Sequence, residues 1–488
     1  MAGIKSLVKD TAIYGVSSIV GRFLNWCLVP LYTAVFLPEE YGVVTNIYAY
    51  VALILVFLTY GMETGFFRFA RRNEHELSSV YTTTLTSIGF TSTLFIALLC
   101  IFITPLSDIM GYGKTPSFVI MMGITVAIDA FTAIPFAYLR YKQRPMRFAF
   151  LKLTNIALNI GLNLFFILLC PWLWDTAPDS IAWFYDPTYG IGYIFVANIL
   201  SSGIIMLLLL PEILAERMSF DSKLLRTMLK FSLPLLIAGL AGIMNQNIDK
   251  IIYPFLFEDQ NIANYQLGIY GANYKIAMVM IMFIQAFRFA YEPLMFSRKN
   301  ENKEQKNREY ADAMKYFVIF GLLIFLGVMF YLDIFKLIIS SKYYEGLIVV
   351  PILLVAELCY GIVFNLSLWY KNIDKTYWAI IFTLIGFIVM ISIIIFGVPR
   401  YGYIACAWAA LACNGIMMLT SYLIGNKVNP IKYDITRILS YVFIAFGIYG
   451  VSILIESPYF WLNITIRTLL LVSYIVIVLK REKIRLRR

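Results

Sequence analysis

The sequence is poor in charge and almost lacks histidine. Only 14% of its 488 residues are Asp, Glu, Lys or Arg, whereas 60% are hydrophobic, and the mean hydropathy is +0.77. A water-soluble chain of this length could not cover its surface with so few charged side chains. We therefore expect the lipid bilayer to be its solvent. The single histidine, His75, lies in a polar stretch, where we expect it to be solvated rather than catalytic.

The sequence also lacks the motifs of metal sites, disulfide frameworks and nucleotide hydrolysis. It has no GxxxxGK[ST] motif, so we expect no ATP hydrolysis by this chain. The six cysteines lie in or beside apolar stretches without paired spacing, which argues against disulfides and zinc. The prediction is a chain that is not an enzyme and that has no cofactor.

Long hydrophobic runs, by contrast, are abundant. A spanning helix needs about 20 apolar residues, and such stretches recur here with short polar segments between them. This pattern predicts an all-α polytopic membrane protein of about fourteen helices, not a β-barrel with its ten-residue alternation. The first stretch is too long for a signal peptide, so we expect it to remain as a helix. The predicted helices cover residues 11–36, 43–66, 80–104, 117–139, 147–170, 188–211, 231–257, 265–293, 313–340, 346–370, 376–397, 402–425, 437–455 and 459–479.

The basic residues mark one side of the membrane. Thirty of the 40 Lys and Arg residues fall in the N-terminus and in alternate loops, whereas the opposite loops hold only Lys114, Lys336, Lys342 and Arg400. The positive-inside rule then predicts that both termini are cytoplasmic. The excess of positive charge is thus explained by topology, and nucleic acid is not expected as a partner.

A weak internal repeat divides the chain. The tetrapeptide FRFA occurs at residues 67–70 and again at 287–290, and Gly21 and Gly242 are separated by a similar offset. A four-residue match can arise by chance, but helices 1 and 7 would also run in the same direction. We therefore predict an N-terminal lobe at 1–220, a C-terminal lobe at 221–430 and a terminal helix pair with a basic tail at 431–488. Parallel repeats of this kind are a transporter architecture.

Charged residues inside the predicted spans are the candidate functional residues. A Lys or Arg at the bilayer centre costs about 2.5 to 3.5 kcal/mol, so each needs an ionic partner, a wet cavity or a nearby interface. At 1.5 Å per residue, Arg22 and Lys275 lie roughly 15 Å inside their helices, near the midplane. The basic residues within predicted spans are Arg22, Lys152, Lys250, Lys275, Arg288 and Arg467.

Two interpretations of these charges remain open. The acids within spans, Asp129, Asp249 and Glu357, could neutralise the bases as structural ion pairs, or could couple transport to an ion. Alternatively, the bases form a cationic cavity for an anion such as a pyrophosphate, which Arg binds bidentately and Lys as a point charge. The residues that we expect in this cavity are Arg22, Lys250, Lys275 and Arg288.

Two stretches resemble the Wzx-type polysaccharide flippases of the multidrug/oligosaccharidyl-lipid/polysaccharide exporter superfamily. They are FLPEEYGVVTNI at residues 36–47 and NIDKIIYPFLFEDQNIANYQLGIYGANYKIA at residues 247–277. The resemblance carries over to Asp249, Lys250, Tyr274 and Lys275. It implies two six-helix lobes plus a terminal pair, and alternating access in the bacterial inner membrane. It also implies flipping of an undecaprenyl-pyrophosphate-linked oligosaccharide to the periplasmic leaflet, with membrane lipids, a polysaccharide polymerase and chain-length machinery as partners.

Three alternatives remain. Lipid II flippases of the same superfamily also bear cavity arginines. Cation-coupled drug exporters usually have twelve helices and place acids near cationic drugs, whereas this chain has more bases than acids within its spans. A membrane polymerase, ligase or acyltransferase would need a sizeable external loop or a catalytic histidine, and the sequence has neither.

Overall fold

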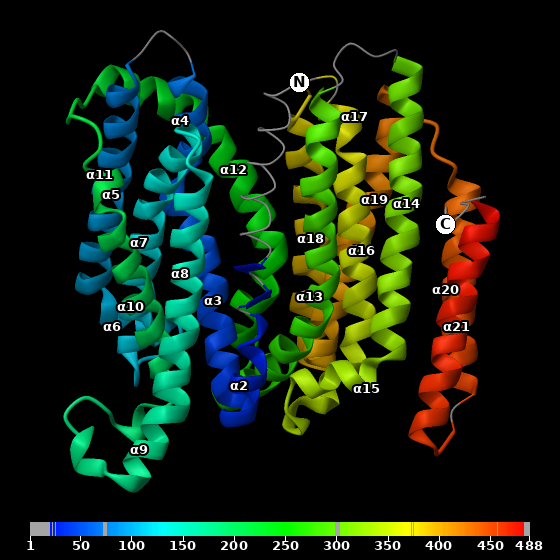
Figure 1. Cartoon of the computed structure of the whole chain (residues 1–488), viewed down its shortest axis with the longest axis horizontal. Coiled ribbons are helices and arrows are strands. Elements are labelled where there is room, and N and C mark those ends of the chain that lie inside the picture. Colours follow the sequence, from blue (N-terminus) through cyan, green and yellow to red (C-terminus); the bar gives the residue numbers. More distant parts are fainter. Residues whose placement is uncertain are drawn as a thin grey trace. The chain divides into compact units, whose positions relative to one another are not determined.

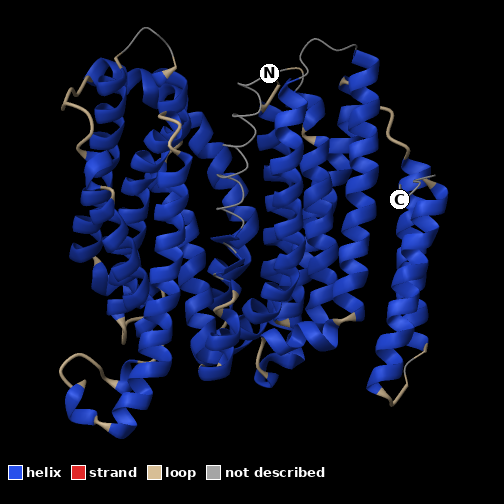
Figure 2. Cartoon of the chain, viewed as in Figure 1, coloured by secondary structure: helices blue, strands red, loops and turns tan. Residues whose placement is uncertain are grey.

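The computed structural model describes residues 20–21, 23–24, 26–71, 76–297, 303–371, 373, 375–455 and 457–482, and that part of the chain is helical without a strand (Figure 2). Twelve of its segments are long and apolar enough to cross a membrane. The expected all-α, multi-pass membrane protein is therefore confirmed. α10 (Gly192–Leu208) is apolar but shorter, and much of the predicted first helix lies outside the described residues. The count of fourteen and the cytoplasmic termini stay predictions.

The chain forms two compact units, Met1–Gly268 and Ile269–Arg488, and the division falls inside α13. α12 packs against α3, α4 and α5 of unit 1 (Figure 1). The lobe boundaries expected at 220 and 430 stay predictions. The helices of unit 1 are α2 (Val29–Val35), α3 (Pro38–Thr59), α4 (Met62–Ala70), α5 (Leu77–Ile101), α6 (Ile103–Ile109), α7 (Pro116–Tyr141), α8 (Pro145–Leu164), α9 (Cys170–Thr176), α10, α11 (Leu210–Ile213), α12 (Ser222–Ile252) and the first part of α13 (Gln260–Ser297).

Short helical turns complete unit 1. A π-helical segment, Phe165–Leu169, joins α8 to α9, so that residues 145–176 form one continuous apolar helical segment. At about 1.5 Å per residue this segment is longer than the roughly 30 Å of a hydrocarbon core. In Figure 1, α9 accordingly lies at the far tip of unit 1. Three 3-10 turns follow at Pro178–Ser180, Pro187–Tyr189 and Tyr253–Leu256.

Unit 2 is built around α14, α16 and α19, which carry most of its buried side chains. Gly361 of α16 lies against Phe317 of α14 and Ile284 of α13, and only a glycine allows this approach. The elements after α13 are α14 (Lys303–Phe330), α15 (Leu332–Phe335), 3-10 segments at Lys336–Ile338 and Ser341–Val349, α16 (Val350–Leu366), α17 (Leu368–Lys371), α18 (Tyr377–Tyr401), α19 (Tyr403–Val428), α20 (Ile435–Leu454) and α21 (Phe460–Arg481).

The terminal pair, α20 and α21, is attached to α14 and α15 by ionic contacts at both ends. Arg467 of α21 contacts Asp333 at 3.0 Å, and Lys336 contacts the same carboxylate at 2.7 Å. The hydrogen bond from Lys336, aided by Arg467 and opposed by burial, holds the pKa of Asp333 below its ordinary value. At the other end, Glu482 accepts from Lys315 of α14 at 2.7 Å. Arg467 is thus an ion-pair residue that fixes one helix to another.

Candidate functional site

Asp249 and Lys250 form a buried ion pair in the last turn of α12. The Lys250 ammonium lies 3.0 and 2.9 Å from the two oxygens of Asp249, and the side chains are only 8% and 2% exposed. Asn46 of α3 donates to the backbone carbonyl of Lys250 at 2.6 Å, while Tyr112 donates to Asn46 at 2.7 Å. The local geometry is that of a structural ion pair, the first of the two interpretations. A role of Lys250 in binding substrate stays a prediction.

Two glycines allow α3 to pack closely against α13. A Cβ at Gly42 of α3 would overlap the backbone carbonyl of Asn264, and a Cβ at Gly268 would overlap the carbonyl of Pro38. The start of α3 and the stretch of α13 from Asn264 to Gly268 therefore cross backbone to backbone, which only glycine permits at both positions. Both glycines belong to the two stretches on which the family resemblance was based. The resemblance thus has a physical basis in a helix crossing.

Asp129 lies on α7 in unit 1, half-buried, and accepts a hydrogen bond from Ser202 of α10 at 2.8 Å. Lys152 of α8 places its ammonium 3.9 Å from the centre of the Phe136 ring. Nearby, Arg140 pairs with Glu63. These groups bring charge of both signs into one helix bundle, which is compatible with either structural neutralisation or ion coupling.

In unit 2, α13 carries the second set of expected residues. Lys275 is half-buried on this helix, and its neighbour Tyr274 donates a hydrogen bond to Glu357 of α16 at 3.0 Å. Glu357 is only 9% exposed. The structure therefore brings the Tyr-Lys segment of the family resemblance beside the expected acid of α16. Lys275 also interacts with other groups, as do Tyr274 and Glu357.

Arg288 lies 13 residues further along α13 and is half-buried. Its guanidinium carbon lies 4.4 Å from the centre of the Phe364 ring, and the ammonium of Lys371 lies 5.0 Å from the centre of that ring. Sequence reasoning missed Lys371, because it was assigned to a cytoplasmic loop. Arg22, the remaining residue of the expected cavity, lies outside the described residues.

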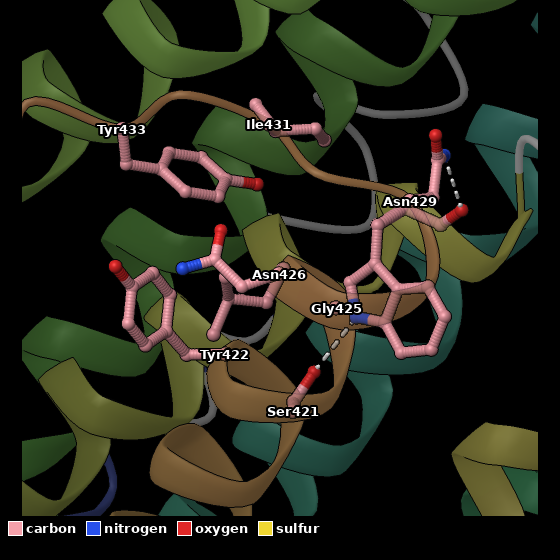
Figure 3. Close-up of a pocket in the computed structure, with 9 residues that line it drawn as sticks. Ser421, Tyr422, Gly425, Asn426, Asn429, Ile431 and Tyr433 are labelled. Atoms are coloured by element: carbon pink, nitrogen blue, oxygen red, sulfur yellow. Dashed lines mark hydrogen bonds between the residues drawn. The ribbon is translucent and has the colours of Figure 1, made fainter.

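A small pocket lies where α17, α19 and the segment after α19 meet (Figure 3). Trp369, Tyr422 and Tyr433 contribute aromatic walls. The Trp369 indole donates to Ser421 at 3.2 Å, and Asn429 donates to the carbonyl of Trp369 at 3.1 Å. The pocket has no room for a water-sized guest, so these contacts fix the chain segment rather than hold a ligand.

Comparison with known proteins assigns the chain to a family. A family model described as "Polysaccharide biosynthesis protein" matches residues 7–298, which is more than half of the chain. The chain belongs to this polysaccharide biosynthesis protein family. A sequence search of curated proteins finds no match.

Solved structures of membrane proteins share this fold. A lipid II flippase MurJ in an inward closed conformation superposes with a TM-score of 0.74 at 16% identity, covering 98% of this chain and 100% of that one. An inward-facing multidrug resistance MATE family transporter of the MOP superfamily gives a TM-score of 0.66 at 14% identity, covering 83% and 94%. The chain therefore has the fold of these two membrane proteins.

Proposed function

We propose that this member of the polysaccharide biosynthesis family flips a polyprenyl-pyrophosphate-linked oligosaccharide from the cytoplasmic to the periplasmic leaflet of a bacterial inner membrane. The family description supports the polysaccharide. The fold supports a flippase, because one protein with the same fold is a lipid II flippase. Membrane lipids would be its surroundings, and a polymerase with chain-length machinery would use its product.

The observation that carries the proposal is the basic character of α13. Lys275 and Arg288 are both half-buried on a helix long and apolar enough to span a bilayer. A charge within the hydrocarbon is costly unless it faces water, a ligand or a partner. Both side chains already interact with other groups, and an anionic pyrophosphate would be a further partner for them. The polyprenyl tail would stay in lipid, and only the head group would cross. We also propose, from the sequence, that Arg22 and Lys250 contribute to substrate binding.

Lipid II is the second candidate substrate. It is favoured by the coverage of the lipid II flippase structure, which spans 98% of this chain. Both candidates carry the same polyprenyl-pyrophosphate chemistry, so the same basic residues would serve either. They differ in what a cell loses when the chain is absent, because a block in lipid II export stops peptidoglycan synthesis, whereas a block in polysaccharide export removes only the surface polymer.

The cellular test is replacement of Lys275 in a strain that depends on this chain for surface polysaccharide. Lys275→Gln should remove most of the polymer, Lys275→Arg should keep part of it, and Lys114→Gln, a matched change at an exposed lysine, should have no effect. Membrane insertion is checked by labelling an introduced loop cysteine. Normal polysaccharide in an inserted Lys275→Gln variant would contradict the proposal. Arrested cell-wall synthesis with intact polysaccharide would favour lipid II.

A further inference from the structure

Lys152, on α8 of unit 1, directs its ammonium at an aromatic ring. The ammonium lies 3.9 Å from the centre of the Phe136 ring of α7. Within the part of the chain that the structure describes, this ammonium makes no hydrogen bond and no ion pair. An aromatic ring attracts a cation, but it accepts none of the ordinary hydrogen bonds that the three N–H groups of an ammonium can donate. The donors of Lys152 therefore remain available to an anion.

Lys142 provides an internal contrast. Its ammonium also lies over a ring of α7, 5.2 Å from the centre of Tyr138, but it is paired with Glu216 at 3.3 Å. Lys142 is exposed at the end of α7, where a charge costs little, whereas Lys152 is half-buried within a helix long and apolar enough to span a bilayer. The lysine in the more costly position is thus the one that lacks a carboxylate at ion-pair distance among the described residues.

The carboxylate of Asp129 acts on Lys152 from a distance. Asp129 of α7 interacts electrostatically with Lys152, but it accepts its hydrogen bond from Ser202 of α10, at 2.8 Å. Asp129 and Phe136 are seven residues apart on α7, so they share one face and are separated by about 10 Å along the helix axis. The hydroxyl holds the negative charge and the ring holds the positive charge, which keeps the two charges apart.

The ammonium of Lys152 points into the helix bundle. α8 packs against α10, and α10 packs against α7 (Figure 1). Phe136 is buried, at 5% exposure, so an ammonium over its ring does not extend outward into the headgroup layer. Lys152 lies seven residues, or about 10 Å, from the start of α8, at the end that we expect to be cytoplasmic. Two other charged groups that act on it, Arg140 and Glu63, pair with each other.

We propose that Lys152 binds a phosphate group at the expected cytoplasmic end of unit 1, and that Asp129 limits the strength of this binding. The inference rests on the proposed function and adds to it one binding residue and one residue that tunes affinity. An ammonium binds phosphate oxygens as a point charge with three N–H donors. A nearby carboxylate repels the phosphate, so the anion can leave again, as a transported group must. The ligand chemistry is a phosphate or pyrophosphate ester, from the lipid-linked substrate or from a bilayer lipid.

The test titrates inorganic pyrophosphate calorimetrically into the full-length protein in phosphatidylcholine nanodiscs. Lys152→Gln removes charge-assisted hydrogen bonds, so it should raise the dissociation constant about tenfold or more. Lys152→Arg keeps the charge and should retain most of the binding. Two controls should leave the dissociation constant unchanged: Lys142→Gln at the ion-paired lysine over Tyr138, and Lys223→Gln at an exposed lysine of α12.

Asp129→Asn gives a readout of opposite sign. Loss of the carboxylate removes repulsion of the anion, so this variant should bind pyrophosphate several-fold more tightly than the wild type. If Asp129 and Lys152 served only to hold the helices together, replacement of either residue would weaken binding or leave it unchanged. Weaker or equal binding by Asp129→Asn therefore overturns the tuning role.

A second arm separates the two sources of phosphate. If phosphatidylglycerol in the nanodiscs weakens pyrophosphate binding to the wild type but not to Lys152→Gln, bilayer lipids also bind Lys152. Absence of competition assigns Lys152 to the substrate, and either result supports the phosphate site. Equal affinity of the wild type and Lys152→Gln in both discs, or an equal loss in Lys142→Gln, overturns it. Binding requires no transport, so this failure is distinguishable from failure of Lys275→Gln to block polysaccharide export.

Discussion

At the scale of single residues, Glu482 makes the most testable contribution to stability. It accepts hydrogen bonds from Lys315 at 2.7 Å and from Tyr441 at 2.8 Å. Burial acts to raise its pKa, but these hydrogen bonds and the nearby positive charges outweigh burial and lower it. A carboxyl whose folded pKa is lowered stabilises the protein above its ordinary pKa of 4.5, and this stability is lost as the pH falls through the folded pKa.

Glu482→Gln should therefore lower the melting temperature at neutral pH, corresponding to a loss of about 1 to 3 kcal/mol. The difference from wild type should shrink as the pH is lowered below 4.5. Thermal unfolding of the purified protein across this pH range checks the prediction. Asp312→Asn is the matched control, because Asp312 contacts the same Lys315 but is 65% exposed. An equal effect of both variants, or a gap that widens in acid, would contradict it.

The ion-pair partners of the charged side chains were the hardest feature to predict from the sequence. Arg467 and Asp333 are 134 residues apart, so no spacing rule could have paired them. Asp249 and Lys250 are neighbours in sequence, and helical geometry points adjacent side chains in different directions. Their ion pair forms because the lysine folds back onto the preceding carboxylate and its carbonyl is fixed by Asn46. The expected residues could be found from sequence, but their contacts could not.

At the scale of elements, the crossing of α3 and α13 depends on two glycines. Gly42→Ala or Gly268→Ala would force the two helices apart where they cross, because each new Cβ would overlap a backbone carbonyl. We expect each substitution to destabilise the protein by about 1 to 3 kcal/mol. Gly161→Ala in α8 is the control, because nothing lies within 4 Å of its Cβ, and it should be neutral or slightly stabilising. Detergent-solubilised melting temperatures distinguish the two outcomes, and a harmless Gly268→Ala would refute the tight crossing.

Helix positions were predicted well because apolar runs and their polar or proline boundaries define them. The helix expected at 117–139 is α7, Pro116–Tyr141, and the one expected at 402–425 is α19, Tyr403–Val428. The helix expected without interruption at 43–66 is instead broken between α3 and α4. Tyr60 and Gly61 both have positive φ, at 31° and 72°, a conformation that ends a helix. Gly61 was the only available signal, and hydrophobicity does not report such a break.

At the scale of the whole molecule, the proposed cationic site predicts dependence on membrane voltage. An inside-negative potential of 100 mV is worth about 2.3 kcal/mol for each charge that crosses it. It favours outward movement of an anionic head group and inward return of the empty positive site. Collapsing the potential with a potassium ionophore should therefore slow flipping strongly, whereas an unchanged rate would argue against charge movement. A block by loss of the proton gradient alone would implicate Asp129 or Glu357 in coupling.

Flipping is measured most directly with the purified chain in liposomes that contain a fluorescent polyprenyl-pyrophosphate oligosaccharide. An added glycosidase reports the fraction of head groups that reach the outer leaflet under an imposed voltage. We expect rapid transfer with the wild type and with Lys114→Gln. With Lys275→Gln, we expect transfer no faster than in protein-free liposomes. Equal transfer by the wild type and by Lys275→Gln would contradict the proposed flippase. It would also be contradicted if the wild type transferred no head group but transported a cationic drug.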